Sequence, residues 1–184
     1  MEVEIATYEI IPEWLKLIKE VEPIFQAPMA DDPEFNEFMN RKLTQNEVLI
    51  VRDKSDNNVL MGVMTISRHR NRISWFAVFN KYRCRGVGSK LLEYAINELG
   101  NDKIIEVTTF QESYSDGIPA RRAYQKFGFI DYDLTVQMNG YPRSLMKRFP
   151  QKVLEFPNSW QRENCNSLQG RCSSGLHVPW KMSR

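Results

Sequence analysis

The sequence predicts an α/β fold, because segments patterned like strands and segments patterned like helices alternate along the first 149 residues. Residues 73–79 form a short aromatic and β-branched run between turn-like residues, which is typical of a strand buried on both faces. Directly after it, Val87, Leu91, Ala95 and Leu99 recur every four residues and predict an amphipathic helix. A strand that runs into such a helix indicates a sheet with helices packed on it.

The elements before this pair follow from the same patterns. In chain order we expect a strand at 3–8, helices at 12–21 and 33–43, and strands at 48–51 and 59–67. Residues 53–58, between the last two strands, are strong turn formers.

Four further elements follow the helix at 87–99, which Gly100-Asn101-Asp102 ends. We expect a strand at 103–110, a short helix within 116–127, a strand at 130–138 and a last strand at 143–149. Apolar residues occupy every second position from Ile130 to Met138, which predicts that one face of that strand is buried. Residues 139–142 form the turn before the last strand.

Length and composition are those of an ordinary globular protein. The chain has 184 residues, 42% of them hydrophobic and 26% charged, and a formal net charge of +2. We expect no nucleic-acid binding, since that function usually requires a strongly basic face. No apolar run approaches the length of a membrane span or a signal segment, so we expect a cytoplasmic protein without membrane association.

The composition changes at the end of the predicted fold. We assign residues 1–149 to one domain and 150–184 to a tail of uncertain order, because the tail has little periodicity and is rich in Ser, Asn, Gln and Gly. Cys165, Cys172 and His177 lie there, but their spacing matches no zinc pattern, and three ligands leave a structural site incomplete. We therefore expect no metal.

The most informative segment is Arg83-Cys84-Arg85-Gly86-Val87-Gly88, which runs into Ser89 at the start of the helix. Glycine has no Cβ, so backbone N–H groups there can close on a ligand. The first N–H groups of a helix have no partner inside it, and the helix dipole makes that end electropositive. The segment predicts a seat for a phosphate or pyrophosphate.

Two common phosphate-binding patterns do not fit this segment. The dinucleotide fingerprint requires a third glycine where this chain has Leu91. The nucleoside-triphosphate loop ends in Gly-Lys-Ser or Gly-Lys-Thr, whereas Gly88 is followed here by Ser89 and then Lys90. The pattern that remains is Arg/Gln-x-x-Gly-x-Gly/Ala.

That pattern resembles the pyrophosphate-binding segment of the GNAT superfamily of acyl-CoA N-acyltransferases. A second segment, in which Ala120 and Tyr124 precede Gly128-Phe129 at the end of a helix, resembles the second GNAT motif. Two motifs in the right order and separation are far more specific than either alone. The resemblance implies a mixed, twisted, mostly antiparallel sheet of six to seven strands flanked by about four helices.

The resemblance also implies acetyl-CoA as co-substrate. Its pantetheine arm would add to the strand at 76–79, and a backbone N–H near Val78 would face the thioester carbonyl. Tyr124 matches the family's tyrosine that protonates the departing sulfur, although packing beneath the cofactor is the alternative role. The implied cofactor-binding residues are Ala77, Val78, Phe79, Arg83, Cys84, Arg85, Gly86, Val87, Gly88, Ser89 and Tyr124.

The general base departs from the family pattern. Many members use a glutamate on the strand before the glycine motif, where this chain offers only Ser74 as a polar side chain. Glu106 and Glu112 are the candidates, and we predict Glu106 as a catalytic residue together with Tyr124. Cys84 is expected to contribute only its backbone, because the family transfers the acetyl group directly within a ternary complex.

The acceptor is a small-molecule or peptide amine whose identity stays open. In the family, segments that correspond to residues 22–32 and 138–141 shape the acceptor site. Asp31, Asp32 and Glu34 would attract a cationic amine, although acidic residues before a helix are also ordinary capping residues. A homodimer is one open oligomeric state.

Two other functions are the alternatives to acetyl transfer. The protein could be a non-catalytic acyl-CoA-binding module, or a nucleotide-binding domain of the Rossmann type.

Overall fold

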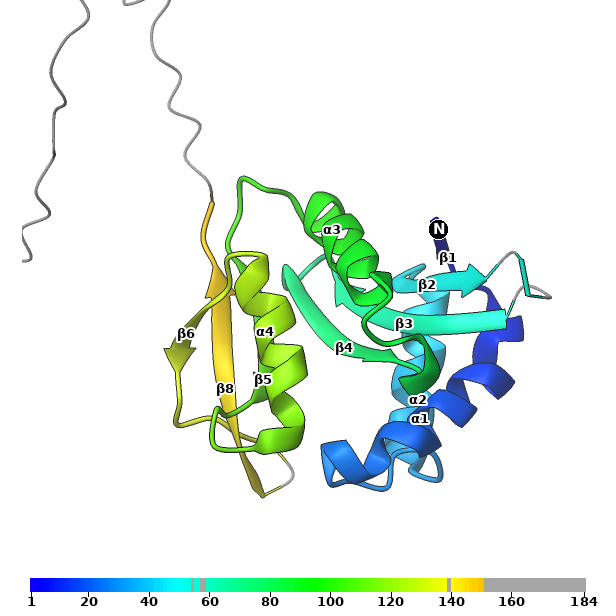
Figure 1. The fold of residues 1–184 in the computed structure, drawn as a ribbon, viewed down its shortest axis with the longest axis horizontal. Coiled ribbons are helices and arrows are strands. Elements are labelled where there is room, and N and C mark those ends of the chain that lie inside the picture. The colour runs from blue at the N-terminus through cyan, green and yellow to red at the C-terminus, as the bar shows by residue number, and fades with distance from the viewer. Residues whose placement is uncertain (54, 57–58, 139, 151–184) are drawn as a thin grey trace, which may run out of the picture. The chain divides into compact units, whose positions relative to one another are not determined.

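The strands form one open sheet in the order β1–β2–β3–β4–β5–β8–β6, with β7 paired to the edge of β8 (Figure 1). The structure is a computed structural model, and it describes residues 1–150 except 54, 57, 58 and 139. The strands are β1 (Val3–Ile5), β2 (Val48–Asp53), β3 (Val59–Ser67), β4 (Arg72–Val78), β5 (Ile105–Phe110), β6 (Ile130–Asp133), β7 (Gln137–Met138) and β8 (Tyr141–Arg148). Among the described strands, every pair is antiparallel except β4 with β5.

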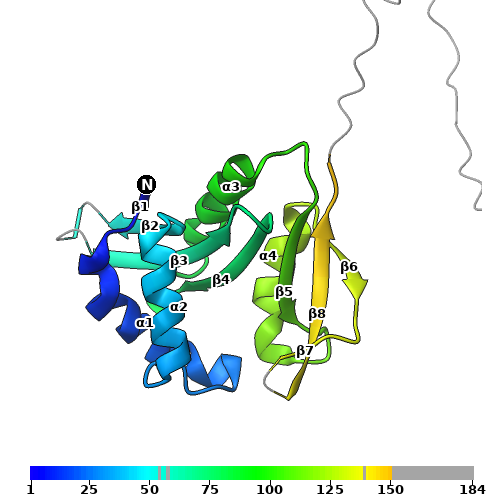
Figure 2. The same ribbon diagram turned by 180° about the vertical axis from the view of Figure 1, so that it is seen from behind.

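Helices cover both faces of this sheet. They are α1 (Ile11–Phe25), α2 (Pro33–Thr44), α3 (Val87–Leu99) and α4 (Ile118–Lys126), with single 3₁₀ turns at Tyr8–Ile10, Asn80–Tyr82 and Ser115–Gly117. Figure 1 shows α3 and α4 in front of the sheet, and Figure 2 shows α1 and α2 on the opposite face. The buried apolar residues form two clusters accordingly, one beneath α3 and α4 and one beneath α1 and α2.

The predicted fold class is confirmed in its main features. The sheet is mixed and mostly antiparallel, and four α-helices flank it in the part of the chain that the structure describes. The strand expected at 59–67 coincides with β3, and the helix expected at 87–99 coincides with α3. Part of the turn at 53–58, Asn139 and all of the predicted tail except Pro150 fall outside the described residues, as do Cys165, Cys172 and His177.

The prediction of one half-buried strand over 130–138 is wrong. The structure has two short strands there, β6 and β7, and the apolar side chains Ile130, Tyr132 and Leu134 are 56%, 61% and 58% exposed. The chain turns because the Asp133 carboxylate accepts hydrogen bonds from both the amide and the hydroxyl of Thr135, at 2.8 and 2.7 Å. Such a local side-chain bond competes with the strand ladder.

The parallel strands β4 and β5 pair over only a short stretch. Only Arg72 with Glu106 and Ile73 with Val107 are in register, and beyond them the two strands separate (Figure 2). The separation begins at a bulge, since Thr65 pairs with Trp75 and Ile66 pairs with Ile73, which leaves Ser74 without an opposite residue on β3. A bulge bends its strand and increases the local twist, which directs the rest of β4 away from β5.

A buried ion pair joins the last turn of α2 to the sheet. Lys42 Nζ donates to Glu47 Oε2 and to the Ile66 carbonyl, both at 2.6 Å, and both charged residues are more than nine-tenths buried. The other carboxylate oxygen of Glu47 accepts the Arg68 amide at 2.6 Å. Both charges are therefore matched and hydrogen-bonded, as burial requires.

We expect Lys42→Met to lower the free energy of unfolding by about 3–5 kcal/mol, because it leaves the buried Glu47 carboxylate without a counter-charge. Chemical denaturation of the wild type and the variant measures this loss. The double variant Lys42→Met/Glu47→Gln removes the uncompensated charge, while its amide oxygen still accepts the Arg68 amide. It should recover most of the stability, and a double variant as unstable as the single one contradicts this account.

Candidate active site

A cavity of about 820 Å³ lies where β4 and β5 separate. Ser74, Trp75 and Phe76 line it from β4, and residues 107–110 line it from β5. Its remaining walls come from both faces of the sheet: Ala120 and Tyr124 of α4, residues 25–29 after α1, Asp31, Asp32, Phe35 and Phe38 of the α2 region, Met138 and Arg143. The cavity therefore passes through the sheet and connects the α3–α4 face with the α1–α2 face.

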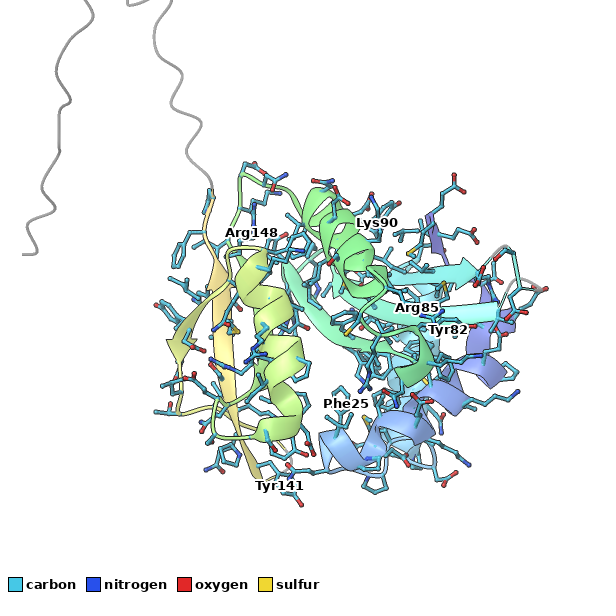
Figure 3. All side chains as sticks on the ribbon, viewed as in Figure 1. Phe25, Tyr82, Arg85, Lys90, Tyr141 and Arg148 are labelled. Carbon is cyan, nitrogen blue, oxygen red and sulfur yellow. The ribbon has the colours of Figure 1, made fainter. Side chains whose placement is uncertain are left out.

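The glycine segment at the start of α3 is open to solvent, as a phosphate seat requires. Gly86 is the residue before the helix and has a φ of 84°, a left-handed conformation that glycine adopts without strain. No side chain caps the helix start, and residues 83–86 are exposed. The first N–H groups of α3 are therefore available to an anionic ligand. Arg85 and Lys90 lie near this end of α3 in Figure 3.

A glycine at position 88 leaves the start of α3 accessible to a ligand, and it is also required by packing. A Cβ at Gly88 would lie 3.0 Å from Cζ of Phe76, so the first turn of α3 rests directly on that ring. The Phe76 ring in turn meets the Tyr124 ring edge to face, with centroids 6.1 Å apart. The glycine segment is thus connected to Tyr124 through one aromatic side chain.

The free edge of β4 faces the gap. Phe79 donates its amide to the Met61 carbonyl of β3 at 3.0 Å, and Val78 is the next residue toward the N-terminus. Neighbouring residues of a strand direct their backbone groups to opposite sides, so the N–H and C=O of Val78 point away from β3. Consistently, the Val78 carbonyl accepts Nε of Arg83 at 3.2 Å. The Val78 N–H is therefore directed toward the open edge.

Gly62 supports this arrangement, and sequence analysis did not select it. A Cβ there would lie 3.1 Å from the Ala77 carbonyl oxygen and 3.1 Å from side-chain atoms of Val78 and Val87. Any larger residue would separate β3 and β4 from the first turn of α3. The available signal was a lone glycine inside an apolar strand, which often marks a close approach.

Tyr124 lies on the buried side of α4 and forms part of the cavity wall. The residue is 4% exposed, and its ring also contacts the ring of Phe129, with centroids 5.6 Å apart. Burial raises the pKa of the Tyr124 hydroxyl above its ordinary value of 10.0. The hydroxyl is therefore protonated at neutral pH, and it can donate a proton or a hydrogen bond into the cavity.

The structure places Glu106 apart from Tyr124. Glu106 is in the short paired part of β5, it does not line the cavity, and Oε1 of its carboxylate lies 3.1 Å from Nζ of Lys147. Glu112, the other candidate, is exposed. The assignment of the general base to Glu106 remains a prediction.

The acidic residues near the start of α2 divide into two groups. Asp31 and Asp32 line the cavity, whereas Glu34 does not. The Asp32 carboxylate accepts the Glu34 amide at 3.0 Å and so caps α2, which accounts for that residue without a ligand.

Arg143 also lines the cavity, although sequence analysis treated it only as the start of a strand. No local pattern marks that arginine as buried.

Arg121 fixes α4 against the sheet. Its guanidinium donates to the Phe110 carbonyl at 2.9 Å and to Oδ2 of Asp131 at 2.6 Å, and the residue is buried. Asp131 also accepts the Ser144 hydroxyl of β8. Arg121 is one turn before Tyr124, so this network holds the helix that carries the tyrosine.

The geometry defines a class of protein: a mixed sheet whose central parallel strands separate at a cavity, with an exposed, uncapped helix start on one face and Asp31 and Asp32 on the other. A profile of the acetyltransferase (GNAT) domain matches residues 22–148. The chain belongs to the GNAT family of acetyltransferases.

Solved structures of low sequence identity share the fold. A GNAT-family acetyltransferase from Bacillus cereus ATCC 10987 superposes with a TM-score of 0.60 at 16% identity, covering 82% of this chain and 98% of that one. A chain of the NatC complex bound to Gag peptide and CoA gives 0.60 at 23% identity, covering 82% and 99%. A point variant of the spermidine N-acetyltransferase SpeG from Vibrio cholerae gives 0.57 at 17% identity, covering 84% and 98%.

Three searches found no match or no site. No curated protein sequence matches the chain. Within the described residues, no helix is both long enough and apolar enough to cross a membrane. In the same residues, no group of three or more His, Cys, Asp or Glu side chains is placed to hold a metal ion.

We expect Asp131→Asn to destabilise the protein at neutral pH more than at pH 3. The Arg121 hydrogen bond lowers the pKa of Asp131 below its ordinary value of 3.8, so the ionised form is favoured in the folded state. That contribution is fully present above pH 3.8 and is lost as the pH falls through the lowered pKa. Urea unfolding at both pH values measures it, and a difference that does not shrink at pH 3 contradicts this account.

Proposed function

We propose that this protein transfers the acetyl group of acetyl-CoA directly to a primary amine in a ternary complex. The supporting observation is the cavity itself, which joins the face that carries the exposed start of α3 to the face that carries Asp31 and Asp32. This arrangement suits a reaction between a bound thioester and a separate amine, because the two substrates could enter from opposite sides and meet at the gap.

The residues of the α3 side fit coenzyme A. The uncapped helix start and the left-handed backbone at Gly86 suit a pyrophosphate, and the space left by Gly62 and Gly88 lets α3 sit close to β4. Arg83, Arg85 and Lys90 add positive charge around it. The unpaired edge of β4 can accept the amide groups of a pantetheine arm as an added strand.

Acetyl-CoA would supply the acetyl thioester. The N–H of Val78 would donate to the carbonyl oxygen as negative charge develops there. The amine nitrogen forms the new bond to the carbonyl carbon, the carbon–sulfur bond breaks, and the Tyr124 hydroxyl would donate its proton to the departing sulfur. The proton lost by the amine leaves through a base, for which Glu106 is the predicted residue.

A non-catalytic acyl-CoA-binding module is the alternative. The carboxylate expected on the strand before the glycine segment is absent, and the predicted base Glu106 does not line the cavity. The two functions differ in one measurement, because a binding module takes up acetyl-CoA but releases no CoA thiol with any amine.

We expect Ser89→Glu to weaken CoA binding by at least about tenfold without lowering the unfolding temperature of the free protein. Ser89 is the third residue of α3, where a glutamate is favourable for the helix, yet its charge would repel the pyrophosphate. Thermal shifts with acetyl-CoA, CoA, NAD and ATP measure the effect.

Ser89→Ala is the matched control, which changes the same side chain without adding charge and should bind CoA nearly as the wild type does. A wild type that shows no shift with either CoA species, or a larger shift with NAD or ATP, contradicts the proposal. Release of CoA thiol with a panel of primary amines then separates the enzyme from the binding module.

We expect Tyr124→Phe to lower kcat by about 100-fold or more, the range for loss of a positioned acid. The Michaelis constant for acetyl-CoA should change little, because phenylalanine keeps the ring contacts with Phe76 and Phe129. Steady-state kinetics measure both constants. If kcat is retained, Tyr124 acts only in packing.

A further inference from the structure

Arg143 is a buried cation in the wall of the cavity. The residue is 5% exposed, and its side chain comes from the start of β8. Nη2 donates to the Phe25 carbonyl at 3.0 Å, and Nη1 donates to the Pro142 carbonyl at 3.1 Å. A guanidinium has five N–H donors, so these two bonds leave donor capacity for a ligand.

No carboxylate of the described residues pairs with Arg143. Its guanidinium instead lies over two aromatic rings, with its carbon 4.9 Å from the centroid of Phe110 and 5.7 Å from that of Tyr141. Burial lowers the pKa of Arg143 below its ordinary 12.5, although an arginine still carries its charge at neutral pH. By contrast, the buried Arg121 has Asp131 at 2.6 Å. A buried charge is ordinarily paired, so a position for an anion is left beside Arg143.

The position of Arg143 excludes the phosphates of CoA as that anion. Arg143 is directly opposite Phe110 in the β5–β8 register, so both side chains are on one face of the sheet. The Phe110 ring contacts the ring of Phe25, at the end of α1, with centroids 5.4 Å apart. Phe25 ends α1, which lies on the face of the sheet opposite α3 (Figures 1 and 2). Arg143 therefore faces the acceptor half of the cavity.

We propose that the acceptor is an amino acid with a large apolar side chain, whose carboxylate binds the guanidinium of Arg143. The inference rests on the acetyl transfer proposed above. A carboxylate is the anion that an amine acceptor most simply carries, and arginine binds it with charge-assisted hydrogen bonds.

The surroundings of Arg143 select the apolar side chain. The acceptor half is lined by five aromatic rings, from Phe25, Phe35, Phe38, Trp75 and Phe110. Phe25 stacks on Trp75 at 5.9 Å, so the wall is continuous. Apolar walls with a few placed polar groups are typical of small-molecule sites, and here the charged groups are Arg143 and the carboxylates Asp31 and Asp32.

The test compares two matched pairs of probes. L-Phenylalanine and phenethylamine, which differ in the carboxylate, serve as acceptors, and N-acetyl-L-phenylalanine and N-acetylphenethylamine serve as binding probes in calorimetry. We expect the carboxylate to improve both kcat/KM and affinity by about 10- to 100-fold in the wild type. Arg143→Met should abolish that preference, because it lowers the values for the probes with a carboxylate more than those for the probes without one. Arg143→Lys, which keeps the charge, should retain part of it.

A purely structural role for Arg143, through its bond to the Phe25 carbonyl, would weaken both members of each pair equally and would overturn the proposal. Arg68→Met is the matched control, because it removes one cation from an exposed residue that does not line the cavity. If Arg143→Met does not fold, Arg143→Lys replaces it, and a carboxylate preference that Arg143→Lys leaves unchanged overturns the proposal.

The outcomes separate this inference from the proposed function. Equal turnover of phenylalanine and phenethylamine overturns the inference and supports acetyl transfer. A carboxylate preference in binding that Arg143→Met removes, without any binding of acetyl-CoA, supports the Arg143 site and contradicts acetyl transfer. A wild type that binds neither acetylated probe overturns the inference.

Discussion

The site depends on the separation of β4 from β5. Two residue pairs hold these strands together at one end, and the bulge at Ser74 turns β4 away immediately afterwards. Had the ladder continued, its hydrogen bonds would have used the edge of β4 and closed the passage between the two faces. The unpaired backbone is tolerated because it borders a cavity that solvent or a ligand can enter, rather than a sealed core. The sheet therefore lacks a few ladder hydrogen bonds at its centre, and a cavity lies in their place.

The two apolar clusters hold different parts of the cavity wall. The cluster under α3 and α4 holds the glycine segment and Tyr124 in fixed relation, through the contacts of Phe76 with both. The cluster under α1 and α2 supplies the aromatic side chains Phe25, Phe35, Phe38 and Trp75 to the cavity wall. β8 reaches both parts, because Ser144 bonds Asp131 beneath α4 and Arg143 bonds the end of α1. That strand fixes the distance between the two halves from the far side of β5.

Local patterns predicted the features that depend on neighbouring residues. The helix at 87–99, the strand at 59–67 and the exposed glycine segment follow from periodicity and from the conformational freedom of glycine. The break in the strand at 130–138 was missed because the Asp133–Thr135 bond outweighs the apolar alternation. The burial of Arg143 and the pairing of Glu106 with Lys147 depend on strands that meet only in the folded sheet. No spacing along the chain encodes those contacts.

The separate cores also affect how this protein can change over generations. Phe35 and Phe38 are only partly buried and contact each other, and Phe35 also contacts Trp75, but they belong to the cluster on the face opposite α3. Replacing them would reshape the wall that meets the acceptor at a modest cost in stability, since half-exposed side chains contribute less burial energy. The segment that carries the glycines would be untouched. Substitutions in one helix can therefore change one wall of the cavity without altering the glycine segment on the other face of the sheet.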